Sequence, residues 1–297
     1  MVIRAEARRA APFGPPSLFA IIDSRRLKME LSRLVRGVLA AGITAFSALA
    51  AGGAHAADLL DTVKERGALI VGVEGTYPPF NFIDTKTHEL DGFDIDVAKL
   101  VAGKLGVKVQ FVKTEWSGIL AGLSSGKFDV ILNQVGITAE REKTFDFSVP
   151  YVASSPQLIL RKNDDNQYKS FADLKGKKLG VSQGSNYEAL AKAQEGVEVK
   201  SYPGAPEYLS DLISKRVDAA LNDQLMTAYL VKTSNIPIQG GAIVGEPKFN
   251  GIPFKKGNPK FKAALDKALE DSFADGEFAR ISTKWFGIDV SKVQKPK

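Results

Sequence analysis

The sequence predicts an α/β protein of two lobes, each with a mixed, mostly parallel β-sheet flanked by helices. Short apolar, β-branched runs alternate with amphipathic segments, and this alternation occurs twice along the chain. The segment GKFDVILN at 126–133 matches KRVDAALN at 215–222, which indicates two copies of one design. Residues 251–297 remain after the second copy, so the chain is expected to return to the first lobe.

Three parts of the chain are therefore expected. Residues 1–56 form a leader, residues 58–152 together with 249–297 form the first lobe, and residues 153–248 form the second lobe. Two chain crossings between the lobes predict a two-strand hinge, which suits closure by bending.

The leader has the pattern of a secretory signal peptide. Arg33 and Arg36 precede an apolar run at 38–51, and Ala54-His55-Ala56 has the small residues of a cleavage site. The apolar run is too short for a membrane-spanning helix. Met29 is the expected true start, because a chain starting there has a leader of ordinary length. We expect cleavage after Ala56 and a mature chain in the periplasm.

Composition narrows the function classes. The 297 residues carry a formal net charge of +6, but five of these charges lie in residues 1–57. The rest of the chain is nearly neutral, which argues against nucleic acid as a partner. The sequence has no cysteine, and His88 is the single histidine after the leader. Thiol catalysis, zinc clusters and a Ser-His-Asp triad are therefore not expected, and neither is a cofactor.

In the first lobe, apolar spacing and glycine stops define the elements. Gly67 and Gly106 are expected to end two helices. The β-α-β-α-β order predicts parallel pairing of the strands. The expected elements are helices over 58–67, 91–105 and 119–124, and strands over 69–73, 108–112 and 130–132.

The second lobe repeats this pattern. A segment containing Gly and Pro, 236–251, is expected to lead back to the first lobe, where two final helices lie at 259–275 and 277–285. The polar segment 163–169 is expected to form a surface loop. The other expected elements are strands over 157–161, 178–181, 197–202 and 217–221, and helices over 187–193, 206–214 and 224–231.

Polar residues follow the central strand of the first lobe. The amide Gln134 and then Gly136 and Arg141 come after the apolar residues 130–132. The planar guanidinium of Arg141 can bind a carboxylate through two hydrogen bonds, and a glycine lets backbone N–H groups approach the same anion. A plain surface arginine after a strand is the alternative for Arg141.

Asp223 holds the corresponding place in the second lobe, because the internal match aligns it with Gln134. A pocket between the lobes would then hold Arg141 from one lobe and Asp223 from the other. These are the two charges that an amino acid zwitterion needs. The alternative for Asp223 is an N-cap of the helix that follows it.

The mature chain resembles the family 3 extracellular solute-binding proteins, the polar amino-acid receptors of ABC importers. Within that family it is most similar to the cystine-binding subgroup, because of EGTYPPF at 74–80, NQV at 133–135 and GSNYE at 184–188. The resemblance implies a type II periplasmic-binding-protein fold. The further motifs that carry the resemblance are at 90–96, 116–120, 136–141, 145–151, 173–176 and 284–287.

The resemblance also implies roles for both ends of an amino acid ligand. Arg141 would bind the α-carboxylate, assisted by the backbone N–H groups of Gly136 and Asn186. Asp223 would bind the α-ammonium, assisted by the Gln134 carbonyl. The family often has Ser or Thr in place of Gly136, so the missing hydroxyl leaves more of the ammonium binding to Asp223.

The remaining implied residues surround the ligand side chain. Tyr77 and Trp116 would sandwich its aliphatic part, and Glu74 would pair with a second, distal amino group, which cystine has. Ser185 and Tyr187 are also assigned to the ligand site. The alternatives are a core role for Trp116 and a loop-packing role for Tyr77.

We therefore expect a monomeric periplasmic binding protein that captures cystine by hinge closure and delivers it to a membrane permease. Another polar or cationic amino acid is the alternative ligand. A periplasmic prephenate or arogenate dehydratase on the same scaffold and a receptor sensor domain are the alternative functions. The dehydratase chemistry needs a general acid, for which only Glu74 and Glu188 are candidates. We expect no enzymatic activity, because the expected site is an amino-acid clamp without a histidine.

Overall fold

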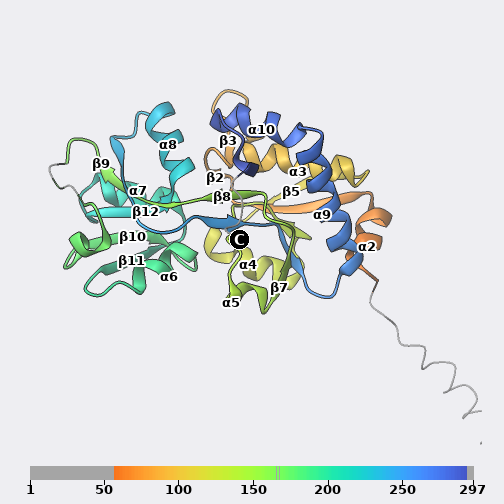
Figure 1. Cartoon of the computed structure of the whole chain (residues 1–297), viewed down its shortest axis with the longest axis horizontal. Helices are drawn as coiled ribbons and strands as arrows, with labels where there is room; N and C mark the ends of the chain where they lie inside the picture. The colour runs from red at the N-terminus through yellow and green to blue at the C-terminus, as the bar shows by residue number, and fades with distance from the viewer. Residues whose placement is uncertain (1–56, 165, 167, 293–297) are drawn as a thin grey trace, which may run out of the picture. The chain divides into compact units, whose positions relative to one another are not determined.

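The computed structural model describes residues 57–164, 166 and 168–292, and Figure 1 shows the arrangement of their helices and strands. The predicted signal peptide, its cleavage site and the alternative start at Met29 lie outside the described residues. Two five-stranded sheets dominate the described chain. Within this part of the chain, no helix is both long enough and apolar enough to span a membrane.

The first sheet contains both parallel and antiparallel pairs. Its strand order is β5 (Lys108–Lys113), β1 (Ala68–Val73), β6 (Val130–Ile131), β15 (Pro253–Lys255) and β7 (Phe145–Phe147). β1 pairs in parallel with β5 and β6, as the sequence predicted. β15 pairs antiparallel with β6 and β7, so one strand runs against the other four. Because β15 lies near the end of the chain, the chain returns to this sheet after forming the second one.

The second sheet has the same design. Its strand order is β11 (Glu198–Tyr202), β10 (Lys178–Ser182), β12 (Ala219–Asp223), β9 (Pro156–Arg161) and β13 (Ile238–Ile243). β10 pairs in parallel with β11 and β12, whereas β9 pairs antiparallel with β12 and β13. Both sheets are therefore mixed, with four strands pointing one way.

Helices pack on each sheet, and we call a sheet with its helices a lobe. The first lobe has α2 (Leu59–Arg66), α3 (Phe93–Lys104), α4 (Trp116–Ser125), α5 (Ala139–Glu142), α9 (Pro259–Ala274) and α10 (Glu277–Phe286). The second lobe has α6 (Asn186–Lys192), α7 (Ala205–Ile213) and α8 (Gln224–Thr233) (Figure 1). A small sheet of β2 (Thr76–Tyr77), β3 (Asn81–Ile83) and β4 (Leu90–Asp91) follows β1. Short 3₁₀ helices lie at Phe171–Leu174 and Val290–Lys292.

Two paired strands connect the lobes. β8 (Val152–Ser154) leads into the second sheet, β14 (Lys248–Asn250) leads out of it, and the two pair antiparallel. This pair is the predicted two-strand hinge. The predicted lobe boundaries, 58–152 plus 249–297 and 153–248, fall in these strands and stay a prediction.

The internal repeat has a structural cause. A carboxylate oxygen of Asp129 accepts a hydrogen bond from the Ile70 N–H at 2.7 Å, and one of Asp218 accepts from the Lys178 N–H at 2.8 Å. In each lobe the aspartate thus satisfies a backbone donor at the start of the neighbouring parallel strand. The two matched aspartates therefore make the same hydrogen bond to a neighbouring strand in the two lobes.

Several predicted boundaries were wrong. The helix predicted from residue 91 begins at Phe93, because Leu90 and Asp91 pair with β3. The helix predicted from 119 begins at Trp116, three residues earlier. The strand predicted over 217–221 runs instead from Ala219 to Asp223. The connecting segment 236–251, predicted without strands, contains β13 and β14, because both find partners far away in sequence.

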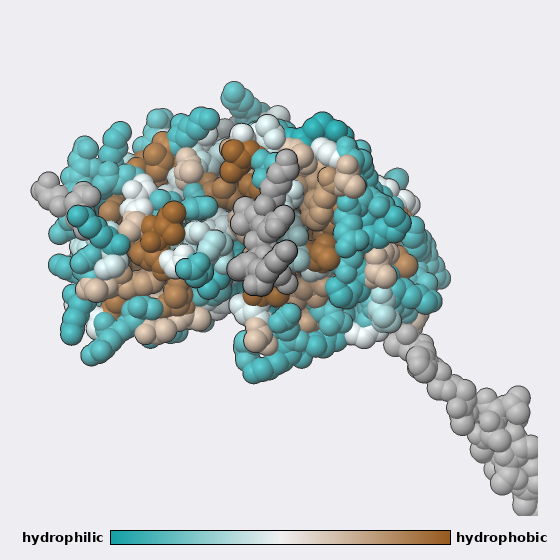
Figure 2. Space-filling model, viewed as in Figure 1, coloured by the Kyte–Doolittle hydropathy of each residue, from teal (hydrophilic) through white to brown (hydrophobic). Residues whose placement is uncertain are grey.

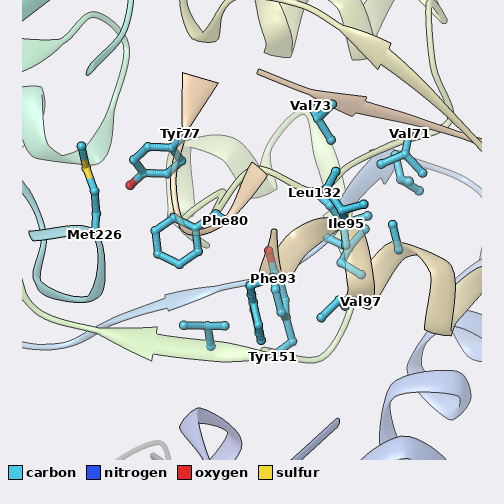
Figure 3. Packing of buried hydrophobic residues seen from close by; sticks show 14 of the residues in the cluster. Val71, Val73, Tyr77, Phe80, Phe93, Ile95, Val97, Leu132, Tyr151 and Met226 are labelled. Atoms are coloured by element: carbon cyan, nitrogen blue, oxygen red, sulfur yellow. The ribbon is translucent and has the colours of Figure 1, made fainter. Parts of the chain in front are cut away.

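Aromatic rings form the centre of a buried cluster that runs through the first lobe into the second (Figure 3). Phe93 and Tyr151 stack with their ring centroids 6.2 Å apart and their planes within 10° of parallel. The Tyr77 ring lies 4.9 Å from the Phe80 ring, and Met226 of the second lobe belongs to the same buried cluster. Burying such rings supplies much of the apolar area that stabilises a core.

One charged residue lies inside this apolar cluster. Asp94 is fully buried and accepts hydrogen bonds from Gln134 Nε2 at 2.7 Å, Tyr151 Oη at 3.0 Å and Asn81 Nδ2 at 3.3 Å. Burial raises the pKa of its carboxyl to about 7, although these hydrogen bonds act in the opposite direction. The free-energy cost of desolvating the carboxylate thus exceeds the stabilisation by its three hydrogen-bond donors.

The surface shown in Figure 2 is mainly hydrophilic, with hydrophobic residues in separate groups. Of the large hydrophobic residues in the described part of the chain, four are exposed: Ile213, Val231, Ile243 and Ile288. Scattered apolar residues of this kind are ordinary on a folded protein and need no partner to explain them.

We predict that the Asp94→Asn substitution weakens the pH dependence of stability in the ligand-free protein. Because the folded-state pKa of Asp94 is raised, its contribution is present below the ordinary pKa near 4 and is lost as pH rises through about 7. A single such group contributes a slope of at most about 1.4 kcal/mol per pH unit. Urea unfolding between pH 5 and pH 8 measures this slope for both proteins.

Asp84→Asn is the control for this experiment. Asp84 lies in an exposed turn, where backbone N–H groups of Thr87 and Lys86 lower the pKa of its carboxyl. In the Asp84→Asn variant, the free energy of unfolding should still fall toward high pH as it does in the wild type. Unfolding curves for Asp94→Asn that run parallel to those of the wild type at every pH would contradict the assignment.

Candidate ligand-binding site

A pocket lies where the two lobes meet, and seven of the ten predicted ligand-binding residues line it. Its cavity is about 20 Å³, which leaves room for about one water molecule. An amino acid therefore needs the walls to move apart before it can bind. The lining residues are Glu74, Tyr77, Trp116, Asn133, Gln134, Ser182, Ser185, Asn186, Tyr187, Ala205 and Asn222.

A larger cavity of about 590 Å³ adjoins this pocket and shares Ser185 and Asn186 with it. Arg141 lines the larger cavity and is absent from the wall of the smaller one. Asp223 lines neither of the two. In this conformation the two charges therefore do not line one cavity, and Asp223 bonds the hydroxyl of Tyr187, a residue of the smaller pocket's wall. A ligand site shared by the two charges stays a prediction.

Arg141 is held firmly by its surroundings. It lies on the short helix α5, whose N-cap Thr138 accepts a hydrogen bond from the Arg141 N–H. Nη1 donates to the Gly136 carbonyl at 2.8 Å, and Nη2 donates to the Gly184 carbonyl of the second lobe at 3.1 Å. The guanidinium carbon lies 5.5 Å from the centroid of the Trp116 ring. These contacts exclude the alternative of an ordinary surface arginine.

The charge of Arg141 lacks a carboxylate partner among the residues that the structure describes. The side chain is 9% exposed, and burial lowers its pKa to about 10. Carbonyl oxygens carry only partial charges, so most of the cost of burying the cation stays uncompensated. A ligand carboxylate at this position would compensate it.

Asp223 presents the opposite case. It ends β12 and caps α8, with the Leu225 N–H donating to Oδ1 at 2.7 Å, so the predicted capping alternative is correct. Ser154 Oγ donates to the same oxygen at 2.7 Å, and Tyr187 Oη donates to Oδ2 at 3.2 Å. The residue is 1% exposed, and burial raises the pKa of its carboxyl to about 6. Within the described chain, all hydrogen-bond donors to this carboxylate are neutral, and no cationic side chain pairs with it.

Tyr187 connects the two buried charges. Its hydroxyl bonds Asp223, its ring lines the pocket, and Arg141 acts on it electrostatically. Burial and the nearby Asp223 raise the pKa of its phenol well above 10, so the hydroxyl keeps its proton. It can therefore serve as the donor that holds Asp223 until a cation arrives.

Glu74 occupies the end of the pocket after β1. Burial raises the pKa of its carboxyl to about 7, which hydrogen bonds from Asn133 and Thr76 only partly oppose. The nearby carboxylates of Glu207 and Glu115 raise it further. A cation at this end of the pocket would relieve both the desolvation and the repulsion.

Among the described residues, three hydrogen bonds run from side chains of the first lobe to the second lobe. Tyr77 Oη donates to Asn222 Oδ1 at 2.7 Å, and Trp116 Nε1 donates to the Gln183 carbonyl at 2.9 Å. The third contact joins Arg141 to the Gly184 carbonyl. The two predicted aromatic residues therefore do more than pack in a core or a loop: they line the pocket and connect the lobes.

The remaining predicted residues surround Arg141. Ser185 caps α6, and its Oγ accepts from the Glu188 N–H at 3.0 Å. A Cβ added at Gly136 would lie 3.4 Å from the Asn186 side chain and 3.5 Å from Arg141 Nη1. These are ordinary contact distances, so Gly136 faces the space beside both Asn186 and the guanidinium.

Gln134 links the pocket to the hinge. It adopts φ 51°, and its Oε1 accepts from Asn250 Nδ2 of β14 at 3.0 Å while its Nε2 donates to Asp94. The prediction that Gln134 belongs to the site is consistent with its place in the pocket wall. Its connection to the buried carboxylate was not anticipated.

Asn133 and Asn222 line the pocket, but they were predicted only as matched repeat positions. Asn133 Oδ1 accepts from the Glu74 N–H at 3.0 Å and from Asn81 Nδ2 at 2.8 Å. Asn222 receives the Tyr77 hydroxyl. A polar residue at the same end of both matched strands was the signal that could have identified them.

The chain has close relatives among known binding proteins. Residues 69–288 match the family described as bacterial extracellular solute-binding proteins, family 3. The L-cystine-binding protein TcyJ of Escherichia coli (strain K12) is 42% identical over 238 residues, covering 79% of this chain and 88% of the relative. The L-cystine-binding protein TcyA of Bacillus subtilis (strain 168) is 42% identical over 236 residues, covering 79% and 87%.

Solved structures show the same architecture. An ancestral arginine-binding protein bound to arginine has a TM-score of 0.69 at 42% identity and covers 75% of this chain and 99% of its own. The ancestral amino acid-binding protein AncCDT-1, a precursor of cyclohexadienyl dehydratase, has a TM-score of 0.72 at 34% identity, with 77% and 99% covered. The predicted type II periplasmic-binding-protein fold is confirmed. The chain belongs to the bacterial extracellular solute-binding proteins, family 3.

Proposed function

We propose that this protein binds L-cystine between its two lobes and delivers it to the membrane permease of an ABC importer. The observation that carries the proposal is the pair of buried, opposite charges on Arg141 and Asp223. Each lacks an ionic partner among the described residues, and each comes from a different lobe. An amino acid zwitterion supplies both missing partners at once.

In this proposal the α-carboxylate of cystine bonds Arg141, assisted by the backbone N–H groups of Gly136 and Asn186. The α-ammonium bonds Asp223 beside the Gln134 side chain. Ser154 and the Leu225 N–H occupy Oδ1 of Asp223, so the ammonium takes the place that the Tyr187 hydroxyl holds on Oδ2. The tyrosine would therefore release its hydrogen bond as the ligand binds.

The second half of cystine distinguishes it from other amino acids. Its distal ammonium would lie against Glu74, and the chain between its two ends would lie between Tyr77 and Trp116. Ser185 and the Tyr187 ring would close the remaining walls. The names of TcyJ and TcyA as L-cystine-binding proteins support this choice over another polar or cationic amino acid.

We also propose that the protein acts as a periplasmic monomer without catalytic activity. The named relatives are binding proteins, including a probable amino-acid ABC transporter-binding protein of Haemophilus influenzae that is 36% identical. The raised pKa of Glu74 would suit a general acid. Incubation with prephenate separates the two functions, because a dehydratase would release phenylpyruvate and a binding protein would not.

We predict that Arg141→Ala weakens cystine binding by about 2 to 5 kcal/mol, because the ligand carboxylate would be buried without a partner. Isothermal titration calorimetry measures the loss. Arg141→Lys should lose part of the affinity, since an ammonium keeps the charge and lacks the planar fork. Arg216→Ala, at an exposed arginine of the second lobe, is the control and should bind normally. Unchanged affinity in Arg141→Ala would remove the carboxylate assignment.

We predict that cystine raises the melting temperature more than arginine, glutamine or histidine at equal concentration. A ligand that binds only the folded state adds about 3 kcal/mol of apparent stability at a hundredfold excess over its Kd. Thermal-shift assays across the amino acids measure this directly. A large shift with arginine or glutamine and none with cystine would overturn the cystine assignment while leaving the amino-acid site intact.

We predict that cystine affinity increases between pH 5.5 and pH 7.5, because Glu74, with a pKa of about 7, must ionise to pair with the distal ammonium. Asp223, with a pKa of about 6, adds to the same trend. Glu74→Gln should flatten the upper part of the profile, which calorimetry across this range can resolve. An identical pH profile in the variant would show that Glu74 makes no ionic contact with the ligand.

A further inference from the structure

Gly204 has a backbone conformation that does not require glycine. It is the N-cap of α7 in the second lobe, with φ −160° and ψ −169°. This is extended backbone that any residue adopts without strain. The reason for a glycine at this position must therefore be the space that a side chain would occupy.

That space is filled by a side chain from the opposite lobe. A Cβ added at Gly204 would lie 2.5 Å from Oε1 of Glu74 and 3.4 Å from Oε2 of Glu207. The shorter distance is well inside van der Waals contact, so a side chain at Gly204 and the present position of Glu74 exclude each other. Ala205, the next residue, lines the same pocket as Glu74.

We infer that Gly204 is a specificity-determining residue, because it leaves room for the Glu74 carboxylate at the end of the pocket that receives a distal cationic group. This inference deepens the proposed function and rests on it. Gly204 acts through Glu74, because the atom nearest to a Cβ added at Gly204 is Oε1 of Glu74.

The surroundings of the Glu74 carboxylate favour a cation beside it. The carboxylates of Glu207 and Glu115 oppose the charge of Glu74. A ligand ammonium would neutralise part of this acidic group, whereas an uncharged ligand end would not.

The test compares Gly204→Ala with the wild type on two ligands. The added methyl group should displace the Glu74 carboxylate, which is the end of a flexible side chain, without disturbing the fold. Cystine affinity should fall by about tenfold or more, because the distal charge pair is lost. Affinity for glutamine, which lacks a distal cation, should change by less than about threefold. Equal losses for both ligands, or no loss for either, would overturn the inference.

Gly103→Ala is the matched control. Gly103 lies within α3, and a Cβ added there meets no atom within 4 Å. The same chemical change should leave the affinity for both ligands as in the wild type. Melting curves of the two variants establish that each remains folded.

A double-mutant cycle tests whether Gly204 acts through Glu74. Glu74→Ala removes the atom that a methyl group at 204 would displace. In that background Gly204→Ala should change cystine affinity by less than about twofold, so the two substitutions would be strongly non-additive. Additive losses would show that Gly204 acts by another route and would overturn the inference.

A measurement without ligand separates this inference from the proposed function. Burial raises the pKa of Glu74 to about 7, so its contribution to stability is lost as pH rises through that value. Glu74→Gln should reduce the pH dependence of the free energy of unfolding when residue 204 is glycine. The reduction should be smaller in the Gly204→Ala background, where the Glu74 carboxylate is already displaced from its buried position. A wild type that fails to bind cystine would refute the proposed ligand. An equal effect of Glu74→Gln in both backgrounds would refute the role of Gly204.

Discussion

The site depends on the burial of two opposite charges that do not pair with each other. Arg141 bonds two backbone carbonyls, and Asp223 bonds two hydroxyls and a backbone N–H. Neutral partners reduce the cost of burying an ion but do not cancel it. Each lobe therefore carries an electrostatic cost, which the zwitterion proposed as the ligand would remove when both lobes enclose it.

The hinge and the pocket share hydrogen bonds. Gln134 lies in the pocket wall, yet its side chain bonds Asn250 of β14 and the buried Asp94. Tyr151, just before β8, donates to the same carboxylate, and its N–H bonds the Asn250 carbonyl. A buried polar network is sensitive to the position of every member. The Asp94 carboxylate thus orients Gln134 in the pocket wall and also bonds Tyr151 beside the strands that connect the lobes.

Local sequence patterns predicted most of the helices and strands. They gave wrong bounds where pairing with a strand far away in sequence determines where an element begins or ends. The helix after the first strand ends at residues 104–105, as the spacing predicted, but its start depends on pairing between β3 and β4. The bounds of β13 and β14 were not predicted, because their hydrogen-bond partners, β9 and β8, lie far away in sequence. Likewise, seven predicted site residues line one pocket, whereas Asp223 lies outside that lining and bonds Tyr187, a contact between β12 and α6 that no local pattern predicts.

The sequence by itself determined the α/β class, the repeated lobe design and the positions of Arg141 and Asp223 after the matched strands. These follow from apolar periodicity, glycine stops and polar residues at strand ends, all of which are local properties of the chain. Only the tertiary structure decided which residues meet. Asp94 bonds Gln134, Tyr77 bonds Asn222, and the Glu74 carboxylate occupies the space that a side chain at Gly204 would take. These contacts join residues from different elements or lobes, so they exist only once the packing of two sheets has fixed their distances.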